Sequence, residues 1–300
     1  MQLNAQAQKK QNDVVFNFFL AMMYTAAITV LLYYLYDGLS FYLTPFIERA
    51  HHEDYRNLRP AGFRGHGLGI LGTAMILLLF LYSARKRFRV FQKFGRVSRW
   101  LNIHIFFGIM GPLFIILHST FKVNGLISVS FWSMIAVALS GVLGRYLYLK
   151  IPHNILGRQL SYDELNQKKM ILNRHLKKKY HIPEKLLSQI EQITERRDME
   201  TRSTLAVIFY LIKEDLTRRS RLRKLIEEYS AELSLESDDL QYFIKIILLK
   251  AKMDSETFFW KRIHSLFHYW HVIHKPFAYI MLLIMVVHVV VAVMMGYTWL

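Results

Sequence analysis

The sequence predicts an all-α integral membrane protein, with five transmembrane helices and a helical insert between the fourth and the fifth. Five apolar segments carry this prediction, because each is long enough to cross a hydrocarbon core about 30 Å thick. Among these segments only the fourth contains a formally charged side chain, Arg145. The segments are residues 14–36, 66–84, 101–121, 126–149 and 276–300.

The spans divide the chain into four predicted parts. Residues 1–13 form a polar cytoplasmic leader, and residues 14–149 hold the first four transmembrane helices. Residues 150–263 form a basic, helical cytoplasmic insert, and residues 264–300 combine a histidine-rich segment with the fifth transmembrane helix. The first span does not resemble a cleaved signal peptide, because its apolar run is too long and no small-residue cleavage site follows it.

Apolar residues at helical spacing predict five helices within the insert. Ser161 and Glu164 stand at the spacing of a capping box, which marks the start of the first of them. No glycine occurs between Gly157 and Gly296, so the insert contains neither a Rossmann fingerprint nor a P-loop. The predicted helices cover residues 161–179, 183–197, 199–216, 219–229 and 237–252.

Basic residues are unevenly distributed, although the whole chain carries 39 Lys and Arg against 22 Asp and Glu. Residues 85–100 hold seven basic and no acidic side chains, residues 150–275 hold 24 basic and 17 acidic, and residues 37–65 hold four of each. The positive-inside rule therefore predicts that the N-terminus, the 85–100 loop and the 150–275 region are cytoplasmic. The 37–65 loop and the C-terminus are expected outside a cell membrane, the inner membrane if the cell is bacterial. This topology explains the basic charge without nucleic-acid binding.

Two pairs of histidines lie within the predicted spans. His104 and His118 are fourteen residues apart in the third span, and His274 and His288 are fourteen residues apart in the fifth. On a helix this spacing places each pair on one face, about 40° apart in rotation and about 21 Å apart along the axis. Two such helices side by side would present two His–His pairs at two depths.

Neutral imidazole is a good axial ligand for haem iron. The chain has no cysteine, which excludes cysteine-ligated clusters and covalent haem attachment. We therefore expect two non-covalently held haems b, with iron ligands His104 and His274 near the cytoplasmic face and His118 and His288 near the outer face.

Other histidines precede the fifth span, and one of them competes with His274. Pro276 disfavours helical backbone at Lys275 and is expected to bend the chain there, which makes His271 the runner-up ligand. His264 and His268 are expected at the membrane surface, although a quinone pocket or a further cofactor remains open for them.

Three more residues are candidates for the haem environment. Gly108 and Gly111 lie between His104 and His118, where missing side chains would let flat macrocycles lie against the backbone. The same glycines would equally permit close approach of two helices. Arg145 would pair with a propionate of the inner haem or extend its charge to the membrane surface.

Histidines paired in this way on two helices resemble those of the di-haem transmembrane cytochromes b. That group includes the cytochrome b of quinol-oxidising complexes and the ferric reductase-like transmembrane domains. The resemblance covers residues 66–149 and 276–300, and it implies a four-helix haem core with bis-histidine ligation. The chain differs from the first group in having fewer spans and no recognisable glutamate-containing quinol motif, and from the second in lacking a flavin and nicotinamide domain.

These features predict a b-type cytochrome that relays electrons across the membrane as a subunit of a respiratory or quinone-linked redox complex, rather than a complete enzyme. Redox partner subunits are expected on the cytoplasmic side, docked on the 155–262 insert, and a membrane quinone is a further candidate partner. The insert has an alternative role as a structural cap on the bundle. The competing hypothesis is a non-redox transporter that uses its intramembrane histidines as proton relays.

Overall fold

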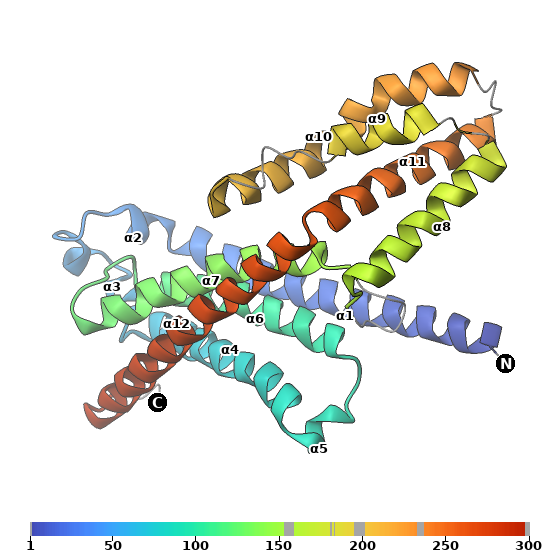
Figure 1. The fold of residues 1–300 in the computed structure, drawn as a ribbon. Coiled ribbons are helices and arrows are strands. Elements are labelled where there is room, and N and C mark those ends of the chain that lie inside the picture. Colours follow the sequence, from blue (N-terminus) through green and yellow to red (C-terminus); the bar gives the residue numbers. More distant parts are fainter. Residues whose placement is uncertain are drawn as a thin grey trace. The chain divides into compact units, whose positions relative to one another are not determined.

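The computed structural model of the chain is helical and describes residues 2–152, 159–180, 182, 184–194, 202–232 and 237–297 (Figure 1). Within these ranges there is no β-strand. The chain forms two compact units. Unit 1 consists of Met1–Val142 and Ile273–Leu300, and unit 2 consists of Leu143–Val272. The boundaries differ from the predicted 150–263 insert, because unit 2 also contains the end of the fourth long apolar helix and the start of the fifth.

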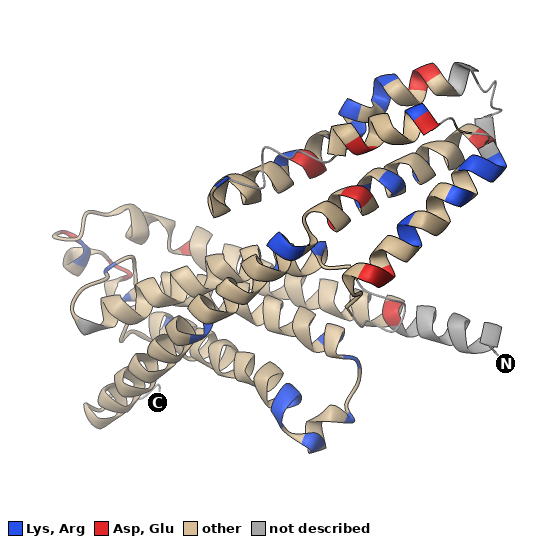
Figure 2. Ribbon diagram, viewed as in Figure 1, with Lys and Arg blue, Asp and Glu red and all other residues tan. Residues whose placement is uncertain are grey.

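Five helices are long and apolar enough to cross a membrane, and they coincide with the five predicted segments. Few Lys, Arg, Asp or Glu residues lie along them, whereas such residues are frequent on the helices of the insert (Figure 2). The five helices are α1 (Gln2–Asp37), α4 (Phe63–Arg87), α6 (Val97–His118), α7 (Leu126–Lys150) and α12 (Trp260–Met294).

Helix α12 is continuous through Pro276, so Lys275 is helical although the following proline disfavours helical backbone there. Proline removes the hydrogen bond to the carbonyl four residues earlier. Long apolar helices nevertheless accept such a residue when neighbouring groups and small local adjustments compensate. His271, His274 and His288 therefore lie on one helix, and α6 likewise continues through Pro112.

In unit 1, α4 and α6 approach closely through glycines. A Cβ atom built on Gly72 would lie 3.1 Å from the carbonyl oxygen of Gly111, and one on Gly111 would lie 3.4 Å from that of Gly72. Contacts of this kind let two helix backbones pack tightly. Helix α1 covers the other side of α6, where the rings of Tyr24 and Phe106 meet edge to face at 4.8 Å.

An apolar cluster joins α4 and α6 to the other two helices of the bundle. Ile76 of α4, Met134 of α7 and Met281 and Met285 of α12 are all buried in it, and Ile115 of α6 packs against them. These residues lie between the levels of the two histidines on α6 and of the two on α12. The four helices thus share an apolar layer midway along the bundle.

The segment between α1 and α4 contains α2 (Leu39–Leu43), η1 (Arg49–His51) and α3 (Tyr55–Leu58). Buried Arg49 holds it by donating hydrogen bonds to the carbonyl oxygens of Tyr42 at 2.6 Å, Thr44 at 2.8 Å and Thr120 at 2.6 Å. The last of these bonds fixes the end of α6, where Thr120 and Phe121 adopt positive φ angles of 49° and 62°. A short α5 (Arg89–Gln92) follows α4.

Unit 2 contains α8 (Tyr162–Tyr180), α9 (Glu184–Thr194), α10 (Thr204–Glu232) and α11 (Ser237–Phe258). The capping box is confirmed, because the Ser161 amide donates to Glu164 Oε2 at 2.8 Å and the Glu164 amide donates to Ser161 Oγ at 3.2 Å. Residues 195–201, on which two of the predicted helices partly fall, lie outside the described residues.

The predicted helices 199–216 and 219–229 form the single helix α10, so the predicted break between them is wrong. Polar side chains hold the helix together across that point. Arg218 pairs with Glu214 one turn earlier, and Thr217 Oγ1 donates to the Lys213 carbonyl at 2.8 Å. Ion pairs at this spacing stabilise a helix at a point where its apolar periodicity is interrupted, here at residues 217–221.

Helices α8, α9, α10 and α11 enclose an apolar core with an ionic group at its edge. Lys250 and Asp254 are fully buried there, and Lys169 and Glu191 complete the group, with Lys169–Asp254 and Lys250–Glu191 distances of 3.1 Å each. Burial raises the pKa of Asp254 despite these two lysines. Burial alone would also raise the pKa of Glu191, but Lys250 and Lys169 hold it below its usual value.

Candidate functional site

Both candidate histidines of α6 are hydrogen-bonded to the backbone of α4. His104 Nδ1 lies 3.1 Å from the carbonyl oxygen of Leu79, and His118 Nδ1 lies 2.8 Å from that of Gly65. Since a carbonyl oxygen can only accept, each Nδ1 carries the ring proton, and Nε2 keeps its lone pair. Leu79 and Gly65 are themselves fourteen residues apart, so antiparallel α4 matches the spacing of the two histidines.

Small and aromatic residues of α4 fit around these rings. A Cβ atom on Gly69 would lie 2.6 Å from His118 Nδ1, so only glycine leaves room for this ring in its observed position. The ring of Tyr82 packs against His104 with centroids 5.1 Å apart. Helix α4 therefore orients both histidines, through its carbonyls and through the shape of its surface.

His274 on α12 has a corresponding partner on α7. Its Nδ1 lies 2.6 Å from Ser140 Oγ, and that hydroxyl donates to the Val137 carbonyl at 2.9 Å. Because the hydroxyl donates to Val137, Ser140 accepts from His274 Nδ1–H. A second bond joins the same two helices, from Ser130 Oγ to the Met281 carbonyl at 3.1 Å.

His288 differs from the other three candidates, because it makes no hydrogen bond with any residue that the structure describes. It lies close enough to His66 to interact with it electrostatically, and His118 is likewise within range of both. The structure thus brings His118, His288 and His66 to one level. His66 was not predicted as a site residue, although its place at the start of the second apolar segment, the same end as His118, was a usable signal.

Two other histidines of α12 bond to carbonyls of their own helix. His264 Nδ1 bonds the Trp260 carbonyl at 2.8 Å, and His271 Nδ1 bonds the Phe267 carbonyl at 3.0 Å, each four residues back. His271 also belongs to unit 2, whereas His274 belongs to unit 1. The runner-up His271 therefore bonds a carbonyl of its own helix, whereas His104, His118 and His274 each bond an oxygen of a neighbouring helix.

The remaining predicted site residues have different surroundings. Gly111 faces α4, where a Cβ would lie 3.2 Å from a side-chain carbon of Ile76, so this glycine supports close helix packing. At Gly108 the nearest atom, of Leu79, would be 3.6 Å away, which leaves space for a methyl group. Arg145 belongs to unit 2, and its guanidinium lies 5.7 Å from the centre of the Tyr148 ring.

The donor set suits a metal held by two imidazoles. Among the residues that the structure describes, no group of three or more His, Cys, Asp or Glu side chains could hold a metal ion. A bis-histidine haem needs only two protein ligands, in the neutral form and with Nε2 directed away from the bonded Nδ1. His104 and His118 meet these chemical requirements, and His274 shares with them the hydrogen bond at Nδ1.

No family model matches the chain, and no curated protein or solved structure matches it significantly.

Proposed function

We propose that the chain is a membrane-embedded b-type cytochrome that relays electrons across the membrane through two haems. The iron ligands are His104 and His274 on one level and His118 and His288 on the other. The observation that carries the proposal is the bonding of Nδ1 in three of these four histidines to an oxygen on a neighbouring helix, which orients each imidazole ring.

A hydrogen bond at Nδ1 does two things for an iron ligand. It fixes the tautomer that presents Nε2 to the metal, and it holds the ring at one angle about its axis. In a helix bundle of low dielectric constant, the bond also gives the buried ring N–H a hydrogen-bond acceptor, and burial without one would cost free energy. A bound haem supplies reversible one-electron chemistry at each level. The chain contributes the ring orientation and the apolar layer of Ile76, Met134 and Met281, which excludes water between the levels.

The proposed orientation places the N-terminus and the polar insert in the cytoplasm and the C-terminus outside. It is supported by the basic residues of the 85–100 loop and of the insert, which are typical of cytoplasmic flanks. Since the chain carries no nicotinamide or flavin motif, we propose that it is one subunit of a respiratory or quinone-linked complex. Partner subunits would dock on the 155–262 insert, and a membrane quinone would exchange electrons with one of the haems.

The ligand assignment is tested with four alanine variants of the full chain, each analysed for haem content and by redox titration. His104→Ala and His274→Ala are expected to lose the same haem and keep the other. His118→Ala and His288→Ala are expected to lose the second haem instead. Two haems in every variant, or losses that pair the histidines differently, would contradict the assignment.

A further inference from the structure

The first part of α10 is apolar on two opposite faces. Residues 205–212 read LAVIFYLI, without a charged side chain. On one face, Val207 and Leu211 are fully buried together with Ile263 of α12 and Leu147 of α7. On the other face, four large apolar residues are exposed to solvent. Their exposed fractions are 69% for Leu205, 73% for Phe209, 39% for Ile212 and 79% for Leu216.

The exposed residues form one continuous stripe. Their spacings of four, three and four residues bring Leu205, Phe209, Ile212 and Leu216 to the same face of the helix. Contiguous apolar patches of this kind mark sites that contact a membrane or a partner. The twelve residues from Leu205 to Leu216 extend only about 18 Å, too short to cross a bilayer. The stripe therefore suits a helix that lies in the membrane surface.

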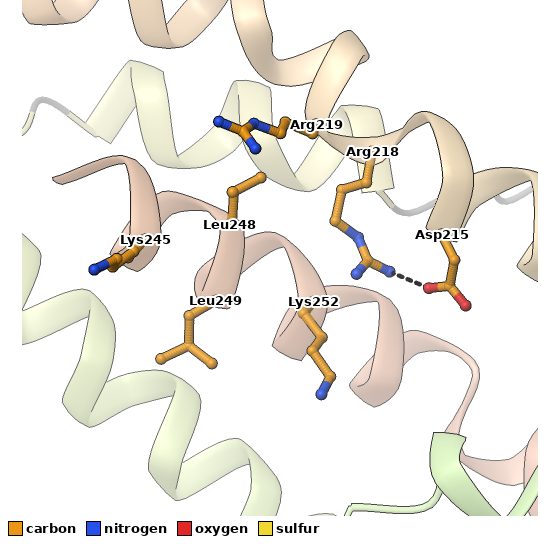
Figure 3. Close-up of a pocket in the computed structure, with 7 residues that line it drawn as sticks. All are labelled: Asp215, Arg218, Arg219, Lys245, Leu248, Leu249 and Lys252. Carbon is orange, nitrogen blue, oxygen red and sulfur yellow. Dashed lines mark hydrogen bonds and ion pairs between the residues drawn. The ribbon is translucent and has the colours of Figure 1, made fainter. Parts of the chain in front are cut away.

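Basic residues follow the stripe directly. Arg219 is fourteen residues after Leu205 and continues the same face, and it lines a hollow of about 350 Å³ with Lys245 and Lys252 of α11 (Figure 3). Arg219 and Lys245 are exposed and form no ion pair with a described residue. The other side chains that line the hollow are Leu248, Leu249, Arg218 and Asp215.

The acidic residues beside this hollow are already paired toward the protein. Glu214 is buried and pairs with Arg218, and Asp215 lies 2.5 Å from Lys150 Nζ and accepts a hydrogen bond from Tyr146 at 3.1 Å. Of the cations that line the hollow, Arg218 pairs with Asp215 at 3.1 Å and Lys252 with Glu256 at 3.6 Å. The unpaired positive charge of the hollow is therefore that of Arg219 and Lys245. Such charge attracts the phosphate groups of anionic lipids near a cytoplasmic membrane surface.

The stripe also lies at the depth where such lipids would be found. The start of α10 packs on the ends of α7 and α12, the helices that we propose to leave the membrane here. The ring of Tyr210 lies 5.6 Å from that of Phe259, and Arg262 donates to the carbonyl oxygen of Arg202 at 2.6 Å. All of these residues belong to unit 2.

We propose that α10 begins in the cytoplasmic lipid interface, with the stripe of Leu205, Phe209, Ile212 and Leu216 among the acyl chains. The hollow lined by Arg219, Lys245 and Lys252 binds the phosphate of an anionic lipid headgroup. This inference rests on the membrane-spanning part of the proposed function and is independent of the haems.

The absence of cysteine from the sequence allows a single fluorescent label to report the environment of the stripe. Full-length Phe209→Cys is labelled and reconstituted in nanodiscs that contain zwitterionic and anionic lipids. Ile171→Cys on α8 is the matched control, because Ile171 is 64% exposed in the same unit. We expect lipids with spin-labelled acyl chains to quench the label at position 209 severalfold more than the label at 171, and iodide to do the reverse.

The headgroup site is tested in the same labelled protein. The double change Arg219→Glu and Lys245→Glu is expected to reduce acyl-chain quenching at position 209 in anionic nanodiscs and to leave it unchanged in purely zwitterionic ones. Loss of quenching upon addition of millimolar inorganic phosphate would assign the hollow to a soluble phosphate compound and overturn its lipid role.

Two results would overturn the inference. The first is iodide quenching of the label at position 209 that equals quenching of the label at 171. The second is shielding of the label at 209 from both quenchers, which would indicate that a second copy of the chain covers the stripe. Haem content is measured in the same samples. Two haems with a water-exposed label at 209 would refute only this inference, whereas a lipid-embedded label without haem would refute only the cytochrome proposal.

Discussion

The two helices that carry the paired histidines are supported in different ways. On α6, both His104 and His118 bond to backbone carbonyls of α4, and glycines bring the two backbones close together. On α12, His274 bonds to the hydroxyl of Ser140, and His288 has no hydrogen bond with a described residue. A backbone carbonyl cannot be removed by substitution, whereas a serine hydroxyl can. The α6 histidines should therefore respond to changes of helix shape, and the α12 histidines to changes of single side chains.

The largest expected effect is on the α6 side, at Gly69. In Gly69→Ala the new Cβ would lie 2.6 Å from His118 Nδ1, so the ring must move or the helices must separate. Overpacking of this kind costs about 1–3 kcal/mol. We expect the loss of most of the haem that depends on His118, measured by redox titration of the purified protein.

Gly108→Ala is the matched control for this change, because its Cβ would meet only Leu79, at 3.6 Å. Retention of both haems in Gly108→Ala is the expected result. The opposite pattern would contradict the account. Loss of haem from Gly108→Ala would mean that a macrocycle lies against Gly108, and no loss from Gly69→Ala would mean that His118 is not an iron ligand in the observed rotamer.

On the α12 side, Ser140→Ala removes the acceptor of His274 Nδ1–H. Loss of such a supporting bond lowers metal affinity by about 10- to 100-fold. We expect faster loss of the haem that depends on His274, measured as transfer to apomyoglobin, and partial recovery in Ser140→Thr. Ser130→Ala, which breaks the other bond between α7 and α12, is expected to cost about 1 kcal/mol of stability without affecting haem transfer. Equal transfer rates in both alanine variants would refute the role of Ser140.

A smaller effect is expected at His66, which shares the level of His118 and His288. If His288 is the second ligand, His66→Gln keeps both haems and alters only the surroundings of one of them. The haem count and the redox titration of His66→Gln are compared with those of His288→Gln. Loss of one haem from His66→Gln together with its retention in His288→Gln would transfer the ligand role to His66.

The smallest effect is expected at Arg145, whose guanidinium lies on the Tyr148 ring of its own helix. Arg145→Gln should keep both haems and both midpoint potentials close to those of the unchanged protein. A clear drop in the potential of the His104-dependent haem alone would show that Arg145 pairs with a propionate.

Much of the fold could be predicted from the sequence, because apolar length and helical spacing are local properties. The five long helices, the capping box of Ser161 and Glu164, and the helices of the insert follow directly from such patterns. The break predicted in α10 was wrong because the pairs that hold this helix together, such as Arg218 with Glu214, are polar. The continuous helix of α12 through Pro276 likewise depends on packing. The preference of a residue before proline for extended backbone does not take packing into account.

The candidate site could be predicted only in part. The spacing of His104, His118, His274 and His288 is visible in the sequence, but their partners are not. Leu79 and Gly65 contribute backbone carbonyls that any residue type would offer, so only the packing of α4 against α6 identifies them. Ser140 is one of four serines on α7, so the sequence alone did not distinguish it, and its pairing with His274 required the structure.

The central claim is most directly tested by a reduced-minus-oxidised absorption spectrum of the purified full-length protein, with a pyridine haemochrome count. Two histidine pairs predict a b-type spectrum and two haems per chain. Absence of haem after gentle purification from a haem-replete host would contradict the cytochrome proposal and favour a transporter in which the same histidines carry protons.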